Sequence, residues 1–141
     1  MRKHLLLLLT LIAVIILGSA CSKEESKAKE NFNEQLKVVE NFIEIAYFDE
    51  GTYEDFTALY ADKDKVNSKK EFTNFREKNE PKDIFPKDYE NVKEVTKHLV
   101  AKKVDKTNVN VYWLENPDKD KTESAKTVWS LTKKDDKWLL N

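Results

Sequence analysis

The sequence predicts an α+β fold, in which helices come first along the chain and an antiparallel sheet of three to four strands follows. In the first half, apolar residues recur at intervals of three and four, the period of an amphipathic helix. In the second half they alternate with polar residues, as in strands that have one buried face. Helices followed by strands favour a layer of helices packed on one face of the sheet.

Residues 1 to 20 have the pattern of a cleaved signal peptide. A short basic start precedes an apolar run from Leu5 to Leu17, which only Thr10 interrupts. The run is shorter than the ~20 residues that a transmembrane helix needs. We therefore expect the chain to be exported and this segment to be removed.

The end of that run, Leu17-Gly18-Ser19-Ala20-Cys21, resembles the lipobox of bacterial lipoproteins, where small residues precede the cysteine that becomes the first mature residue. Cys21 is the only cysteine in the chain, and Gly18 stands where the lipobox usually has leucine. The resemblance implies cleavage before Cys21 and a palmitate-type diacylglyceryl anchor on its sulfur. Two acyl chains give lasting membrane attachment, whereas one binds marginally. The alternative is a secreted protein with a free thiol.

This resemblance divides the chain into a lipoprotein signal peptide over residues 1 to 20, a lipidated tether over residues 21 to 30, and a single α+β domain over residues 31 to 141. The anchor would hold the domain on the extracytoplasmic face of the cell membrane. Abundant lysine, glutamate and asparagine are typical of AT-rich genomes and suggest a Gram-positive host. Charges of both signs are interleaved and the formal net charge is -1, so a nucleic-acid partner is not predicted.

The first helix is predicted over residues 30 to 48, where one apolar face recurs. Gly51 is expected to end it, because glycine adopts a left-handed conformation without strain. The residues of the apolar face are Phe32, Leu36, Val39, Ile43 and Ala46.

Two shorter helices with N-terminal caps follow. Thr52 is expected to cap a helix over residues 53 to 60. Ser68 and Glu71 have the spacing of a capping box, which predicts a third helix that extends to about residue 79.

The strands are predicted after a segment that Pro81 and Pro86 keep irregular. Residues 92 to 103 also suit a helix, but the hairpin pattern that follows favours one long strand there. Turns are expected over residues 116 to 122 and 133 to 136. The residues predicted to alternate along the strands are Val109, Val111 and Trp113, then Ala125, Thr127, Trp129 and Leu131, and finally Trp138 and Leu140.

The element order, and the strand-turn-strand ending over residues 128 to 131 and 135 to 140, resembles the cystatin-like and nuclear-transport-factor-2-like domains of small Gram-positive lipoproteins. The resemblance covers roughly residues 30 to 141. It implies a curved sheet wrapped around a helix layer, sometimes with a pocket between them. Some such lipoproteins are encoded on mobile elements.

No catalytic residue, metal site or cofactor is predicted. His98 is the only histidine after the signal peptide, and we expect it to face solvent from a strand. Paired carboxylates such as Asp135-Asp136 stand in polar contexts that indicate solvated turns. One glycine after residue 20 cannot build a phosphate-binding loop.

Three aromatic residues are the candidates for a ligand pocket: Tyr112, Trp113 and Trp129. The alternation places the two tryptophans on the face that also bears the apolar residues, which favours a core cluster over a pocket wall. An isomerase-like pocket of the nuclear-transport-factor-2-like kind would need a buried acid beside these residues, and no position in the sequence marks one.

The predicted function is that of a non-enzymatic binding or interaction domain, held at the membrane next to a protein or cell-wall partner whose effective concentration the tether raises. The family resemblance extends this to a mobile-element lipoprotein that contacts a membrane machine. A cystatin-type protease inhibitor is disfavoured, because the only glutamine, Gln35, lies inside the first helix and not in an inhibitory loop. The alternative is a small-molecule-binding or enzymatic pocket domain of the nuclear-transport-factor-2-like type.

Overall fold

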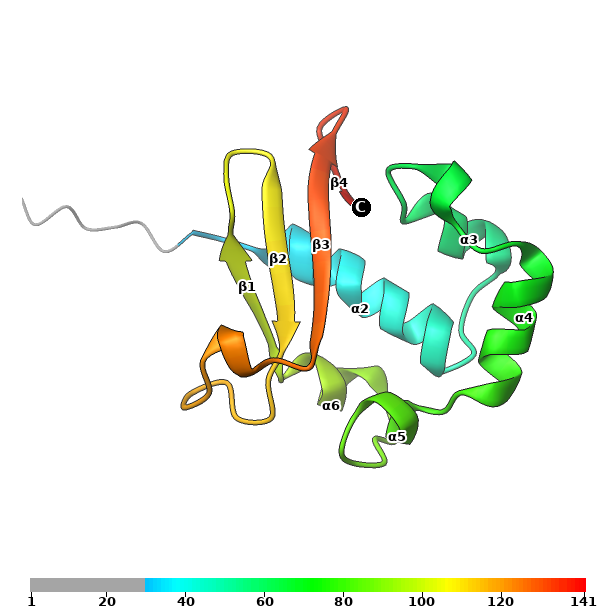
Figure 1. Cartoon of the computed structure of the whole chain (residues 1–141), viewed down its shortest axis with the longest axis horizontal. Helices are drawn as coiled ribbons and strands as arrows, with labels where there is room; N and C mark the ends of the chain where they lie inside the picture. Colours follow the sequence, from blue (N-terminus) through cyan, green and yellow to red (C-terminus); the bar gives the residue numbers. More distant parts are fainter. Residues whose placement is uncertain (1–29) are drawn as a thin grey trace, which may run out of the picture. The chain divides into compact units, whose positions relative to one another are not determined.

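The computed structural model describes residues 30 to 141, so the predicted signal peptide, the Cys21 anchor and the tether up to residue 29 lie outside the described residues. The folded unit Phe32–Asn141 has the predicted α+β architecture, with helices first and a four-stranded antiparallel sheet after them (Figure 1). In this described part, no helix combines the length and the apolar character that crossing a membrane requires.

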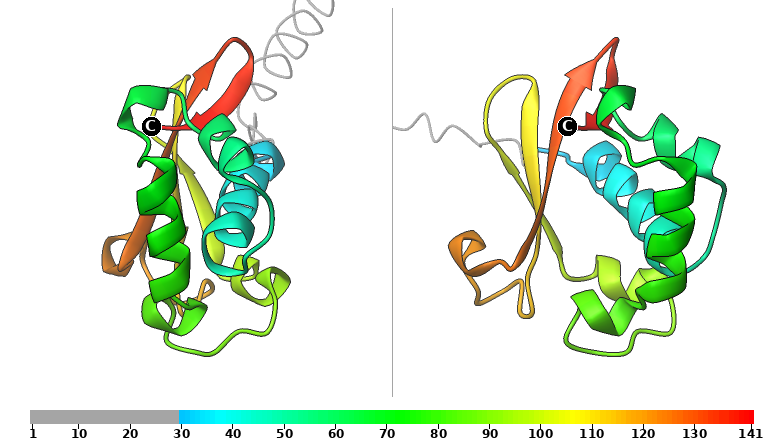
Figure 2. Two further views of the ribbon diagram at one scale, coloured as in Figure 1. Left: turned by 90° about the vertical axis from the view of Figure 1, so that its right-hand side faces the viewer. Right: turned by 45° about the vertical axis from the view of Figure 1, so that its right-hand side comes forward.

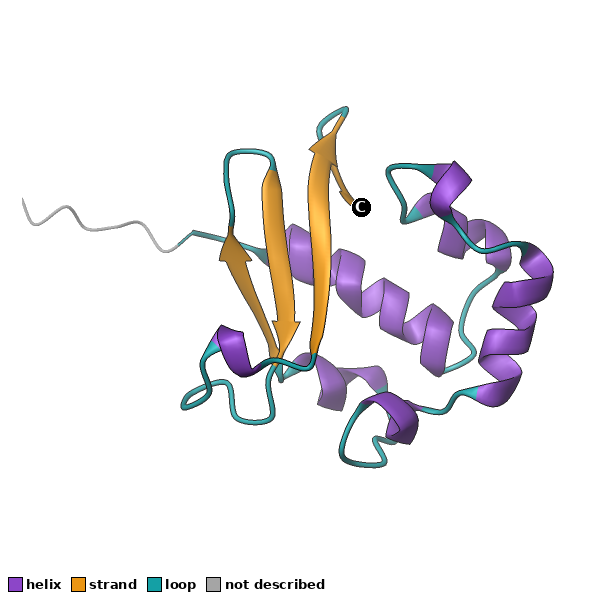
Figure 3. Ribbon diagram, viewed as in Figure 1, coloured by secondary structure: helices purple, strands orange, loops and turns teal. Residues whose placement is uncertain are grey.

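The helical half begins with one long helix and continues with shorter ones (Figure 3). Both predicted N-caps form, and each is a capping box: the Thr52 side chain accepts a hydrogen bond from Asp55 N at 3.1 Å, and Ser68 pairs in the same way with Glu71. The elements are α2 (Asn33–Tyr47), α3 (Tyr53–Ala58), a 3-10 turn (Lys63–Lys65), α4 (Lys69–Lys78), α5 (Pro81–Ile84) and α6 (Val92–Thr96).

The sheet is a meander in which each strand pairs with the next along the chain. Its last turn contains only Asp135 and Asp136, both with positive φ, because such a two-residue turn matches the twist of its strands. The strands are β1 (Leu99–Lys103), β2 (Asn108–Trp113), β3 (Thr127–Lys134) and β4 (Lys137–Leu140), and a further 3-10 turn, Thr122–Ser124, precedes β3.

The core lies between α2 and one face of the sheet, and the views of Figure 2 show the helices gathered on that side. Val39 and Ile43 on α2 are fully buried. The register sets Val111 opposite Trp129. Buried and outward-facing residues therefore alternate along β2 as predicted. The buried Gln35 carboxamide connects α2 to β4. In the orientation that satisfies both partners, its nitrogen donates to Phe32 O at 3.1 Å and its oxygen accepts from Trp138 Nε1 at 3.1 Å.

The second helix ends earlier than predicted, at Ala58, because the chain leaves the helix to pair with the last strand. Leu140 N donates to Leu59 O at 2.7 Å, and Ala61 N donates to Leu140 O at 2.8 Å. The edge of β4 is therefore covered by the segment that follows α3, which leaves β1 as the other edge of the sheet.

The prediction of one long strand over residues 92 to 103 is wrong in its first half. Asn91 caps α6 by accepting a hydrogen bond from Glu94 N at 3.2 Å, and Val92 and Val95 are buried three residues apart on one helical face. Only Leu99–Lys103 forms a strand. The segment that we expected to be irregular also contains a helical turn, because Pro81 suits the first helical position and Asp83 accepts a hydrogen bond from Glu80 N at 2.7 Å.

Candidate functional site

A groove of about 520 Å³ lies where β2 ends and β3 begins. We call it the Trp113 groove, and it is lined by residues 82 to 86, 113 to 115, Asp120 and residues 124 to 126. It thus joins the α5 segment to the two ends of the long loop between β2 and β3. A volume in the range of roughly 300 to 1,000 Å³ is typical of ligand pockets.

The floor of the Trp113 groove is apolar and deeply buried. Phe85, Trp113 and Leu114 are exposed by only 1%, 6% and 3%. The rings of Phe85 and Trp113 are in tilted contact, with centroids 5.4 Å apart. Leu114 N donates to His98 O at 2.9 Å, which continues the β1–β2 pairing beyond Trp113 and fixes the backbone beneath the floor.

His98 supports this floor from behind and does not face solvent from a strand as predicted. It lies half-buried in the turn between α6 and β1, and its ring stacks on Trp113 with centroids 5.1 Å apart. Its Nδ1 lies 2.9 Å from Leu114 O and 3.0 Å from Glu115 O. Because both neighbours are acceptors, Nδ1 carries the proton and donates to them. The imidazole therefore positions Trp113 and the start of the loop.

Two buried polar atoms in this region have no hydrogen-bond partner among residues 30 to 141: Tyr89 Oη and Trp113 Nε1. Each such atom costs about 1–3 kcal/mol when it is left unsatisfied. Burial raises the pKa of the Tyr89 phenol, and the negative charges of Glu115 and Glu94 raise it further. Tyr89 therefore stays a neutral donor that packs against His98, with ring centroids 5.8 Å apart.

The rim of the groove bears exposed charges of both signs. Lys82 and Lys126 supply ammonium groups, and Asp83, Glu115 and Asp120 supply carboxylates. Asp120 also accepts a hydrogen bond from Asn116 N at 2.8 Å, which orders the loop at its base. Because these carboxylates are exposed, they suit charge recognition better than general acid catalysis, which needs a buried acid with a raised pKa.

The three aromatic residues singled out in the sequence do not share one site. Trp113 lines the groove, whereas Trp129 is buried in the core with its ring 6.2 Å from that of Phe42. Tyr112 lies on the opposite face of the sheet, where its hydroxyl accepts a hydrogen bond from Asn110 Nδ2 at 3.2 Å.

Sequence reasoning missed the other walls of the groove. Residues 82 to 86 were expected to be irregular, and residues 124 to 126 stood next to a predicted turn. The available signal was the apolar pair Ile84 and Phe85, which stands between charged residues and Pro86.

Within residues 30 to 141, no group of three or more His, Cys, Asp and Glu side chains could hold a metal ion. Comparisons with protein-family models, with curated proteins and with solved structures find no match to this chain. A function for the chain therefore has to be inferred from its sequence and from the geometry of the Trp113 groove.

Proposed function

We propose that this protein is a lipid-anchored, extracytoplasmic binding domain without enzymatic activity, and that its Trp113 groove holds a short peptide segment of a partner. The observation that carries the proposal is the groove itself, because an apolar floor beneath a rim of both charges lies on one side of the molecule. The anchor rests on the sequence, through the signal peptide and Cys21.

A peptide matches the chemistry of the groove in two ways. An apolar side chain can pack on Ile84, Pro86 and Ala125, the apolar lining residues that are not buried, where apolar contact stabilises by about 25 cal/mol per Å² of surface removed from water. Charged side chains beside it can meet Lys126 on one part of the rim and Glu115 on another. Exposed ion pairs add little affinity, so in this proposal the apolar lining supplies the binding energy and the rim supplies selectivity.

Tethering makes weak binding sufficient. A diacylated Cys21 would confine the groove close to the membrane, where the effective concentration for a neighbouring protein is high. The partner in this proposal is a membrane machine or a peptide component of the cell wall. The helix layer against a four-stranded meander supports the cystatin-like arrangement that we infer for the domain.

The second candidate is a small-molecule pocket of the nuclear-transport-factor-2-like type, which acids beside Trp113 favour. The packing between α2 and the sheet argues against it, because Val39, Ile43, Val109 and Val111 fill that space and are buried almost completely. The carboxylates at the groove are those of its exposed rim.

A peptide library displayed on phage tests the proposal. We expect the full chain to enrich short peptides that combine one large apolar residue with charged neighbours. Lys126→Glu should invert the charge preferred at one position, because it changes the sign of that part of the rim. Lys70→Glu is the matched control, since Lys70 is exposed on α4 and does not line the groove.

Enrichment of no peptide by the wild-type chain would overturn the proposal. Identical peptides from the wild type and Lys126→Glu would also contradict it, since they would bind elsewhere. The proposal is supported if Lys126→Glu reverses the charge preferred in the enriched peptides and Lys70→Glu does not.

A further inference from the structure

A second cavity, of about 170 Å³, lies among α2, α3 and α4, away from the residues of the Trp113 groove. We call it the aromatic chamber, and we propose that it binds a small neutral aromatic molecule that carries a hydrogen-bonding group, of which phenol is the simplest example. Its lining consists of six aromatic rings and one amide: Phe42, Tyr47, Phe56, Tyr60, Phe72, Phe75 and Asn67.

The size of the aromatic chamber suits one six-membered ring, since an apolar protein cavity of about 150 Å³ accommodates benzene. Its walls present both ring faces and ring edges. Phe56 and Phe72 are tilted with centroids 4.7 Å apart, and Tyr47 meets Phe75 edge-to-face at 5.6 Å. A guest ring can adopt offset or edge-to-face contacts with such walls, and these geometries stabilise aromatic pairs beyond the burial of apolar area.

Two phenol groups, those of Tyr47 and Tyr60, belong to the lining of the chamber. Burial, with a smaller contribution from the neighbouring Tyr60, raises the pKa of Tyr47 to about 12. Burial also raises the pKa of Tyr60. Both hydroxyls therefore remain neutral over the physiological pH range, and each can donate to or accept from a guest hydroxyl.

Anionic guests are disfavoured. The residues of the lining carry no formal charge, so a guest anion would lose its hydration without gaining a counter-ion there. An anion would face the negative faces of the rings.

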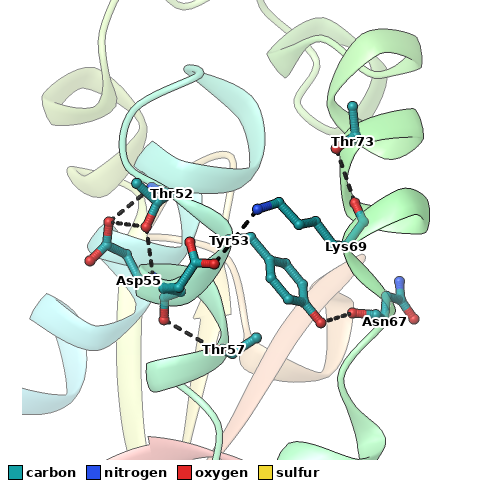
Figure 4. A network of polar contacts seen from close by, with 8 residues as sticks. Thr52, Tyr53, Asp55, Thr57, Asn67, Lys69 and Thr73 are labelled. Carbon is teal, nitrogen blue, oxygen red and sulfur yellow. Dashed lines mark hydrogen bonds and ion pairs between the residues drawn. The ribbon is translucent and has the colours of Figure 1, made fainter.

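Polar contacts hold the walls of the chamber apart before a guest arrives. Figure 4 shows Tyr53 on α3 reaching the start of α4, where its hydroxyl donates to Asn67 O at 2.8 Å. Lys69 Nζ lies 3.7 Å from Glu54 Oε1 across the same gap. These contacts order α3 relative to the start of α4, which reduces the free energy that binding loses in ordering the site.

Titration of phenol and toluene into the full chain tests the proposal, with chemical shifts of the aromatic side chains and the melting temperature as readouts. We expect saturable shifts confined to the lining rings, a concentration-dependent rise in melting temperature, and tighter binding of phenol than of toluene. One hydrogen bond of about 1 kcal/mol corresponds to a preference of about fivefold. The double variant Tyr47→Phe/Tyr60→Phe should lose that preference and still bind both molecules.

Asn67→Trp should abolish binding by filling the chamber from its exposed lining position, while the backbone carbonyl that Tyr53 uses is retained. Lys70→Trp, three residues along the chain on α4 and outside the lining, is the matched control. Absence of saturable shifts at the lining rings of the wild type, or unchanged binding in Asn67→Trp, would overturn the proposal. Equal affinity of the wild type for phenol and toluene would overturn the role of the hydroxyls.

Discussion

At the scale of single residues, four positions among residues 30 to 141 adopt the left-handed backbone region, and one of these four is glycine. Gly51 has φ 71°, whereas Asp49, Asp135 and Asp136 have φ values of 56°, 48° and 60°. Aspartate tolerates this region better than most residues, but glycine adopts it without steric cost. The two turns therefore respond to substitution in opposite directions.

Gly51→Ala should lower the free energy of unfolding by about 1 kcal/mol or more, because alanine is strained at positive φ. A Cβ there would also lie 3.0 Å from Ile45 Cγ1. Asp136→Gly should raise the free energy of unfolding by up to about 1 kcal/mol, since a two-residue hairpin turn favours glycine at that position. Urea denaturation of the three proteins measures both effects, and changes of the same sign would contradict the prediction.

The capping boxes make stability depend on pH in acid. Hydrogen bonds from Thr52 lower the pKa of Asp55 below its ordinary value of 3.8, and hydrogen bonds from Ser68 lower that of Glu71 below 4.5. For carboxyls with a lowered pKa in the folded state, the stabilisation is complete above the ordinary value and is lost as the pH falls through the folded value.

Asp55→Asn/Glu71→Gln should therefore show a shallower loss of stability than the wild type between about pH 5 and pH 2. Thermal unfolding across this range measures the slope. Asp118→Asn, an exposed substitution in the β2–β3 loop, serves as the control. If the stability of the double variant falls as steeply with decreasing pH as that of the wild type, other carboxyls are responsible for the loss.

At the scale of elements, the sequence predicted helices and strands most accurately where the apolar pattern fits only one kind of secondary structure. The apolar period of residues 30 to 48 fits only a helix, and α2 (Asn33–Tyr47) is confirmed. Strict alternation likewise predicted β2 and most of β3, although Ala125 lies outside the strand that begins at Thr127. These elements bury a single face, so their periodicity and their packing agree.

The elements that sequence reasoning missed are short and depend on local caps. The spacing of Val92, Val95 and Leu99 fits a helix and a strand about equally, and Asn91 caps the helix that forms. An asparagine at this position is a sequence signal for a helix N-terminus and favours α6 over a strand. The turn of helix at Pro81–Ile84 is too short to show a period, so only the preference of proline for the first helical position could have indicated it.

A pair of valines on the sheet tests the assignment of its two faces. Val111→Ala should cost about 2 kcal/mol, because Val111 is fully buried against α2 and its truncation leaves a cavity. Val128→Ala should change the free energy of unfolding by less than about 0.5 kcal/mol, because Val128 is 51% exposed on the other face. Chemical denaturation of both variants provides the comparison, and similar costs would indicate that the second face is covered in solution.

At the scale of the whole molecule, the sequence singled out one of the residues that line the Trp113 groove, Trp113 itself. The alternation placed Trp113 on the inner face, where the structure confirms it. The groove exists because residues 82 to 86 and 124 to 126, far apart in the chain, meet at that tryptophan. Such a meeting depends on tertiary contacts, and the alternation that includes Ala125 indicates a strand but not which segment packs beside it. The aromatic chamber escaped prediction for the same reason.

The membrane anchor is the remaining prediction at this scale. The full chain expressed in a Gram-positive bacterium with its own signal should fractionate with membranes and carry a diacylglyceryl mass on Cys21. Cys21→Ala should lose both the added mass and the membrane association, because no other residue can form the thioether. Intact-mass measurement and fractionation check this, with Ser22→Ala as the neighbouring control. An unmodified, soluble wild type would indicate a secreted protein.

Helix α2 contacts β1, β2 and β4, reaches β3 through the rings of Phe42 and Trp129, and also contacts α3, α4 and α6. Opening one of these neighbours uncovers part of its apolar face while the others still hold the helix in place. Its central backbone amides, beside Val39 and Ile43, therefore exchange with solvent hydrogen only when the entire unit unfolds, whereas α4 and α5 can open locally. A protease can therefore cleave the centre of α2 only in globally unfolded molecules. The rate of cleavage there reports the cooperative stability of the domain.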